Sequence, residues 1–485
     1  MNGMKKKRHE PTWARLGFSQ QPEEEGGKGI GIVIIDTIRP HHTIRHLGSR
    51  LQYISVKDDL SINCREIACE APNDADGDKG EHGLMAVLAL AHQPFEIDGI
   101  KYASLSPAAT FIVLDHNAFK EGEGERLQHG LNYILDRSDE WNIRIILSMG
   151  WHALDDGVLL KNTSENSTVQ ALASAVKRGI LVICANGNTR LDNIMPPIAY
   201  LAVGGYNDHG SADLAVHSPY PDEPWGRNGD GHLRPDVLAP RVYLPIPYCE
   251  TMEKPDELSY FWGTSGASTL VTGVCAYLLG KYPNLSIDIL RNVVVDVGVP
   301  FAGHNNPAPR INVANIIRAL DNGYCKRDVP ASACPIMVTD PHKSLASCDE
   351  IEKGLALSIL VKDGQCGREQ LWEMAADHSS IVRKIAVSAL DKPKDDKERK
   401  RYWENLHKER EGGVRGWYAF GLLHDATRDE VALWIRWATD LNWTVRWCVN
   451  GYLSKFPEFP VLEKTHDPDS ILNKAQPIFE WYEKI

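Results

Sequence analysis

The sequence predicts an α/β domain with a mainly parallel sheet, followed by an all-α domain built from helical repeats. Three observations support this prediction. Residues 31–35 form a continuous apolar run, which is typical of a parallel strand buried on both faces. Long apolar stretches that begin near residues 82 and 265 suit helices packed on such a sheet. Beyond residue 343 the pattern becomes helical, and Val-Arg pairs recur at intervals of 32 and 31 residues.

Polar residues stand where the apolar segments of the first domain begin or end. Asp36 follows the first strand directly, and His82 opens an apolar stretch, residues 84–91, that predicts a buried helix. Ser265 opens a second long helix. Because active sites gather at the carboxyl ends of parallel strands, these three residues are expected at one rim of the sheet. One face of the second helix is predicted to meet the core, and it carries Leu270, Val271, Val274, Cys275, Leu278 and Leu279.

Four polar residues have the chemistry of one catalytic site. A serine hydroxyl attacks a carbonyl only when an imidazole takes its proton, and a carboxylate must hold that imidazole in the right tautomer. A further donor must stabilise the oxyanion that forms. Ser265, His82 and Asp36 can fill the first three roles. Asn188 can fill the fourth.

Residues 29–320 resemble the subtilases, the subtilisin-like serine peptidases. The motifs stand in the Asp–His–Ser order that subtilisin uses. They are IIDT at residues 34–37, EHG at 81–83, ANGN at 185–188 and GTSGAS at 263–268, and residues 145–150, 201–205 and 234–240 match further family landmarks. The resemblance implies a subtilisin-like three-layer α/β/α fold and peptide-bond hydrolysis by the triad Asp36, His82 and Ser265, with Asn188 in the oxyanion hole.

The resemblance also implies where a substrate binds. In subtilases a strand like residues 145–150 pairs with the substrate backbone beside the main specificity pocket. The candidate substrate-binding residues are therefore Ser148, Met149 and Gly150.

The chain departs from the usual family pattern at several positions. His-Gly is followed by Leu84-Met85, where the family usually has Thr-His. Gly266 replaces a frequent methionine, Thr269 a usual proline, and Arg241 a usual glycine. None of these changes removes a group that the chemistry needs, so they indicate a divergent member.

Simpler roles exist for each candidate residue taken alone. Serine is a common helix N-cap, and asparagine is a common turn former. A single histidine before an apolar helix often caps the helix or lies hydrogen-bonded in the core. A second class of function therefore stays open, in which a subtilase-like fold binds a partner protein but does not hydrolyse it.

Composition and charge exclude several classes of protein. The chain has 485 residues, a net charge of −12, 43% hydrophobic and 24% charged residues. This acidic balance argues against nucleic-acid binding. Neither a membrane span of about 18 apolar residues nor a signal peptide is expected. Ten cysteines without an export signal indicate reduced thiols, so a cytoplasmic location is expected.

No cofactor or metal is expected to be required. One acidic loop, residues 73–78, offers oxygen ligands, and many subtilases bind calcium. The helix–loop–helix calcium pattern nevertheless fails, because Lys79 and Met85 stand where it needs glycine and glutamate. Calcium here therefore stays a possibility only. Residues 1–28 are an N-terminal extension that could cover the cleft or form a disordered tail.

The remaining third of the chain divides into a linker, residues 321–343, and a helical domain, residues 344–485. The repeated Val-Arg pairs resemble HEAT-type repeats, in which such a pair opens the second helix of each hairpin. Asp377 and Asp440 precede two of the pairs and are expected partners of the arginines. A non-repeating helical bundle is the alternative. Repeats of this kind bind proteins, so a protein or peptide substrate and a docked protein partner are expected.

Overall fold

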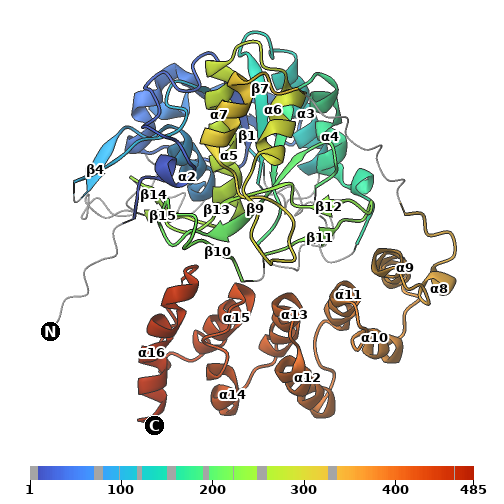
Figure 1. The fold of residues 1–485 in the computed structure, drawn as a ribbon. Coiled ribbons are helices and arrows are strands. Elements are labelled where there is room, and N and C mark those ends of the chain that lie inside the picture. Colours follow the sequence, from blue (N-terminus) through green and yellow to red (C-terminus); the bar gives the residue numbers. More distant parts are fainter. Residues whose placement is uncertain are drawn as a thin grey trace.

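Figure 1 shows the computed structural model, in which an α/β domain lies against a curved row of helices. The structure describes residues 9–69, 80–97, 99–116, 123–149, 160–188, 196–221, 223–247, 259–325, 336–463 and 465–484.

The core of the first domain is one mainly parallel sheet, as predicted. Its strands are β1 (Gly31–Ile35), β2 (Leu51–Val56), β3 (Ile62–Arg65), β6 (Thr110–Leu114), β7 (Ile143–Ser148), β8 (Leu181–Ala185), β9 (Leu201–Asn207), β10 (Ser218–Pro219) and β13 (Val237–Pro240). They run in the order β10-β9-β8-β7-β1-β6-β2-β3, and β13 also pairs with β9. Only β3 and β10, at the two ends of this order, pair antiparallel to their neighbours.

Helices cover both faces of this sheet and complete three layers. They are α2 (Glu81–Ala91), α3 (Glu123–Leu135), α4 (Ser167–Lys177), α5 (Gly263–Lys281), α6 (Ile287–Asp296) and α7 (Val313–Asp321). Because side chains alternate along a strand, Ile32 and Ile34 of β1 pack with α2 and α5. Val33 and Ile35 pack on the other face, with α3 and α4.

The helix α5 is more deeply buried than the sequence pattern suggested. One apolar face was expected, yet every residue from Gly263 to Ala276 is buried. The reason is its central position, because it packs against α2 on one side and the sheet on the other. A helix enclosed on all sides needs small or apolar residues all round, and its Gly, Ala, Ser and Thr residues meet that need.

Short elements complete the domain. The hairpins are β4 (Phe95–Ile97) with β5 (Ile100–Tyr102), β11 (Gly226–Arg227) with β12 (Leu233–Arg234), and β14 (Leu244–Ile246) with β15 (Ser259–Phe261). The 3₁₀ helices are η1 (His42–Arg50), η2 (Ile67–Cys69) and η5 (Thr163–Glu165).

The N-terminal segment is fixed to the α/β domain by a buried ion pair. Arg15, the last residue of α1 (Thr12–Arg15), bonds Asp208 at 2.7 Å, and neither side chain reaches solvent. The same guanidinium donates to the carbonyls of Val242 and Tyr243. Residues 1–8 lie outside the described part, so the hypothesis that the extension covers the cleft stays a prediction.

The second domain is all-α, as predicted, and has its own apolar core. Its helices are α8 (Pro341–Ser344), α9 (Glu350–Lys362), α10 (Arg368–Met374), α11 (Ser380–Leu390), α12 (Asp396–Lys408), α13 (Gly412–Leu423), η6 (Arg428–Glu430), α14 (Val431–Ile435), α15 (Trp443–Leu453), η7 (Pro468–Ser470) and α16 (Ile471–Tyr482). Figure 1 shows them side by side in a row that curves beneath the α/β domain. None of the helices in the described ranges is long and apolar enough to cross a membrane.

Three arginines make the same contacts in alternate helices of this row, α11, α13 and α15. Arg383, Arg415 and Arg446 each stand in the first turn of a helix, directly after a buried valine. Each donates to the backbone carbonyls five and six residues before it. The regular spacing of the sequence therefore corresponds to a regular structural contact.

The carboxylates of Asp377 and Asp440 pair with basic side chains of earlier helices. Arg383 bonds the backbone carbonyl of Asp377, whose carboxylate instead pairs with Lys353. The carboxylate of Asp440 pairs with Arg415 of the preceding unit at 2.8 Å. The expected partners are confirmed through their backbone carbonyls, since Arg383 donates to the carbonyl of Asp377 and Arg446 to that of Asp440. Their carboxylates point back along the row, where they join one unit to the one before it.

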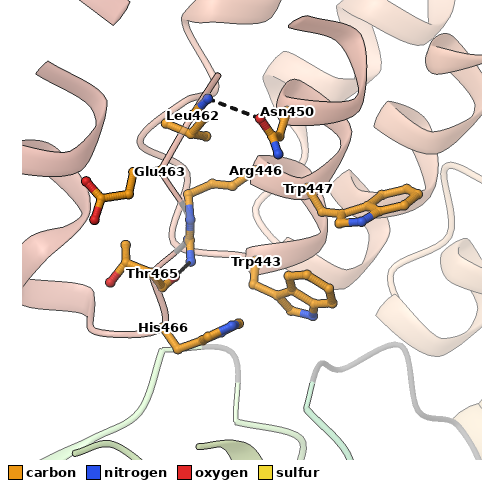
Figure 2. Close-up of a pocket in the computed structure, with 8 residues that line it drawn as sticks. All are labelled: Trp443, Arg446, Trp447, Asn450, Leu462, Glu463, Thr465 and His466. Carbon is orange, nitrogen blue, oxygen red and sulfur yellow. Dashed lines mark hydrogen bonds between the residues drawn. The ribbon is translucent and has the colours of Figure 1, made fainter. Parts of the chain in front are cut away.

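The C-terminal end of the row contacts the α/β domain. The hydroxyl of Tyr220 donates to the carbonyl of His466 at 3.0 Å, and His209 lies 2.7 Å from Asp469. Figure 2 shows that His466 and Trp443 stand at the edge of the row that faces the α/β domain. At the other end, Arg227 pairs at 2.7 Å with Asp349, the N-cap of α9.

Candidate active site

Asp36 and His82 meet at the rim formed by the carboxyl end of β1. Asp36 directly follows β1, and His82 is the second residue of α2. Nδ1 of His82 lies 2.6 Å from Oδ2 of Asp36, and the other oxygen, Oδ1, accepts from the amide of Thr37. This approach requires Gly83, because a Cβ at that position would lie 2.4 Å from the carbonyl oxygen of Thr37.

The surroundings of His82 raise its pKa. Desolvation of the ring acts to lower the pKa, but the charge of Asp36, its hydrogen bond and the nearby Glu81 together raise it more. A carboxylate on Nδ1 also fixes the tautomer, so that in the neutral ring Nε2 is the free base.

Ser265 lies in the first turn of α5 and is 7% exposed. Phe261, the last residue of β15 and two residues before α5, packs on His82. Its ring stands edge-on to the imidazole, with centroids 5.4 Å apart. Between Nε2 of His82 and Oγ of Ser265, both within the described ranges, no hydrogen bond is formed. Such contacts are often long in an enzyme without its substrate.

Asn188 is oriented by three donors that share its side-chain oxygen. Oδ1 accepts from the amide of Thr264 at 2.9 Å, from the hydroxyl of Thr264 at 3.2 Å and from Arg241 at 2.9 Å. Gly263, at φ +79°, leaves room for the contact, since a Cβ there would lie 2.7 Å from Oδ1. The oxygen is thus directed to the start of α5, and the nitrogen is the end of the amide that carries protons for a ligand.

The candidate substrate-binding residues lie only partly within the described ranges. Ser148 ends β7, which is paired with β1 and β8 on its two edges, so the strand itself cannot add a substrate strand. Met149 is buried, and its sulfur accepts from the hydroxyl of Thr269 on α5. Gly150 lies outside the described residues. A role in substrate binding therefore stays a prediction for all three.

No group of three or more metal-binding side chains occurs in the part of the chain that the structure describes. The acidic loop at residues 73–78 lies outside that part. Calcium binding there stays a prediction.

Two residues beside the site carry no sequence motif. Arg241 and Glu223 form a buried ion pair at 2.5 Å next to Asn188. The only sequence signal was that Arg241 stands where subtilases usually have glycine. Nothing in the sequence connected Glu223, 18 residues earlier, with that position.

The chain shows similarity to several known proteins. Among solved structures, the chain is similar to a mutant of the protease domain of PatA, with 19% identity over 62% of this chain and 99% of that one, at a TM-score of 0.44. It is also similar to the S41 psychrophilic protease, with 16% identity over 63% and 99% and a TM-score of 0.46. Fervidolysin from Fervidobacterium pennivorans shows 16% identity over 63% of this chain and 45% of its own, again at 0.46.

With TM-scores below 0.5, these three structures show nothing about this chain beyond the similarity itself. No curated protein sequence matches the chain. A family model gives the clearer result, since the model described as "Subtilase family" matches residues 27–302. Because that match covers more than half of the chain and includes Asp36, His82, Asn188 and Ser265, the chain belongs to the subtilase family.

Proposed function

We propose that the protein is an endopeptidase that hydrolyses peptide bonds through Asp36, His82 and Ser265. The observation that supports this most is the 2.6 Å hydrogen bond between His82 and Asp36 at the rim where α5 brings Ser265. The bond directs the basic nitrogen of the ring away from the carboxylate, as a general base requires.

The reaction follows from these positions. Oγ of Ser265 attacks the scissile carbonyl while Nε2 of His82 takes its proton, and Asp36 stabilises the imidazolium that forms. The developing oxyanion is stabilised by Nδ2 of Asn188 and by the amide of Ser265 at the positive end of α5. The imidazolium then protonates the leaving amine, and water releases the acyl group by the same steps in reverse.

Labelling with a fluorophosphonate probe tests the proposal. Such a probe phosphonylates only a serine that an assembled site activates. We expect the purified full chain to be labelled, and peptide mass spectrometry to locate the label on Ser265. His82→Ala should lose the label, and Ser265→Ala is the control for labelling elsewhere.

A folded protein without label would contradict the proposal. It would favour the second function, a subtilase fold that only binds a partner. In that case Ser265→Ala would also leave the cellular phenotype of the protein unchanged.

We further propose that residues 344–485 are HEAT-like repeats that dock a protein and restrict the substrates. The repeated arginine contacts support a modular array, because each unit bonds the next in the same way. Seven cysteines are free thiols, which supports a reducing cytoplasmic location: Cys64, Cys184, Cys275, Cys325, Cys348, Cys366 and Cys448. If the array selects substrates, charge reversals on its surface should slow cleavage of the protein substrate but leave hydrolysis of short peptides unchanged.

A further inference from the structure

Arg241 contacts the catalytic elements through both its backbone and its side chain. It directly follows β13, and its amide donates to the carbonyl of Tyr206 at 3.1 Å. Its own carbonyl accepts from the amide of Gly263, the first residue of α5, at 2.9 Å. The residue therefore lies between the sheet and the start of the helix that carries Ser265.

The guanidinium of Arg241 bridges two partners. One nitrogen donates to Oδ1 of Asn188 at 2.9 Å, and the other donates to Oε2 of Glu223 at 2.5 Å. The cation also lies over the ring of Tyr220, 3.9 Å from its centroid. With only 3% of its side chain exposed, Arg241 is held in one orientation by three neighbours.

The backbone of β9 is shaped to admit this pair. Oε1 of Glu223 accepts from the amide of Gly205 at 2.7 Å, which fixes the carboxylate. A Cβ at position 205 would lie 2.4 Å from Cδ of Arg241, and one at Gly204 would lie 2.6 Å from Oε1 of Glu223. Both glycines therefore make room for a buried ion pair directly beside Asn188.

We propose that Arg241 is a positioning residue for the oxyanion hole, acting through Asn188. This inference rests on the proposed peptidase function. The guanidinium anchors the amide oxygen of Asn188, so that Nδ2 is already oriented when the oxyanion develops. Its positive charge also polarises the amide and makes the Nδ2 protons stronger donors. Glu223 and Tyr220 hold the guanidinium in place.

The test measures phosphonylation of Ser265, because the phosphonyl oxygen occupies the oxyanion hole. Varying the concentration of the fluorophosphonate separates the maximal rate, kinact, from the binding constant, KI. Arg241→Met alone would leave the charge of Glu223 buried and unpaired. The variant is therefore Arg241→Met with Glu223→Gln, in which the glutamine oxygen can still accept from Gly205.

We expect kinact of this paired variant to fall about tenfold, with KI unchanged, because the contact between Nδ2 of Asn188 and the oxyanion, which Arg241 prepares, forms only on the path to the transition state. Asn188→Ala should lower kinact by about 10²- to 10³-fold, as for the loss of such a donor in subtilisin. In the Asn188→Ala background the paired change should cause no further fall. If Arg241 acted only on the overall fold, the paired change would lower kinact by the same factor in the wild-type and Asn188→Ala proteins.

Arg310→Met is the matched control. Arg310 is also buried, lies over an aromatic ring and bonds backbone carbonyls, but does not contact Asn188. It should lower the melting temperature and leave kinact unchanged. If the paired variant does not fold, Arg241→Lys replaces it. A single ammonium cannot bridge Glu223 and Asn188 as the planar fork does, so kinact should still fall.

The outcomes distinguish a failure of the proposed function from a failure of the role proposed for Arg241. An unlabelled wild-type protein, or an Asn188→Ala variant with unchanged kinact, would contradict the proposed function itself. Normal kinact in the folded Arg241 variants, or a full additional loss in the Asn188→Ala background, would overturn the role of Arg241 alone.

Discussion

At the scale of single residues, the site depends on how neighbouring charges set the state of His82. The proposed mechanism requires His82 to be neutral, and the pKa of His82 is raised by Asp36 and Glu81 against the effect of desolvation. A larger share of the imidazole is then protonated at a given pH. Activity should therefore rise with pH through a midpoint above that of an ordinary histidine.

Glu81→Gln tests this effect without removing a catalytic group. Because the substitution removes a charge that raises the pKa of His82, the acid limb of the labelling rate should move to lower pH. The maximal rate at high pH should stay the same. Glu369→Gln, on α10, is a control in which neither value should change. An unchanged acid limb in Glu81→Gln would contradict the effect of Glu81 on the pKa of His82.

At the scale of elements, the site depends on how closely α2 approaches the end of β1. Gly83→Ala should push the helix away, because its Cβ would lie 2.4 Å from a backbone oxygen that cannot turn aside. We expect the phosphonylation rate to fall on the order of 100-fold, as for a displacement of about 1 Å at a reacting group. Gly280→Ala on α5 is the control, since its nearest contact would be an ordinary 3.5 Å.

The helical row gives a second prediction at this scale. Arg415→Ala leaves the buried carboxylate of Asp440 without its partner, and it should destabilise that part of the row by roughly 3 kcal/mol. Arg428→Ala removes a pair in which both side chains are well exposed, and it should cost below about 1 kcal/mol. Hydrogen exchange of α13 and α15 measures both. Equal effects would contradict the role of the arginine contacts in joining the units.

The sequence predicted the elements that have an unambiguous pattern. The strand before Asp36 and the helices that begin near His82 and Ser265 were recognised because their apolar runs are long. The enclosure of α5 on all sides was missed, because small residues such as Gly273 fit a surface turn as well as a helix in the centre of a fold. The partner of the Asp440 carboxylate and the partners of Arg241 were also missed, since each contact depends on which segments the fold brings together.

At the scale of the whole molecule, the helical row ends against the active-site rim. The ring of His466 stacks on Trp262 at an interplanar angle of 13°, and Trp443 packs edge-on to the same indole. Trp262 is the residue directly before α5. The second domain therefore contacts the segment that leads into Ser265.

Trp262→Ala should loosen this contact. We expect hydrogen exchange of the amides at residues 465–470 to become about fivefold faster, because an aromatic pair contributes about 1 kcal/mol. Exchange in α9, at the other end of the row, should not change. Trp262→Phe keeps a ring and should give a smaller effect. Identical exchange in all three proteins would show that the stack does not hold the two domains together.

The position of Trp262 also limits the path of a bound polypeptide. Only two residues separate it from Ser265, and the rings of His466 and Trp443 stand beside it. Under the proposed peptidase function, we expect a long substrate to meet the second domain within a few residues of the point of cleavage on this side. The helical row would then form a wall of the route by which a protein substrate enters, and a flexible chain segment would pass it more readily than a folded surface.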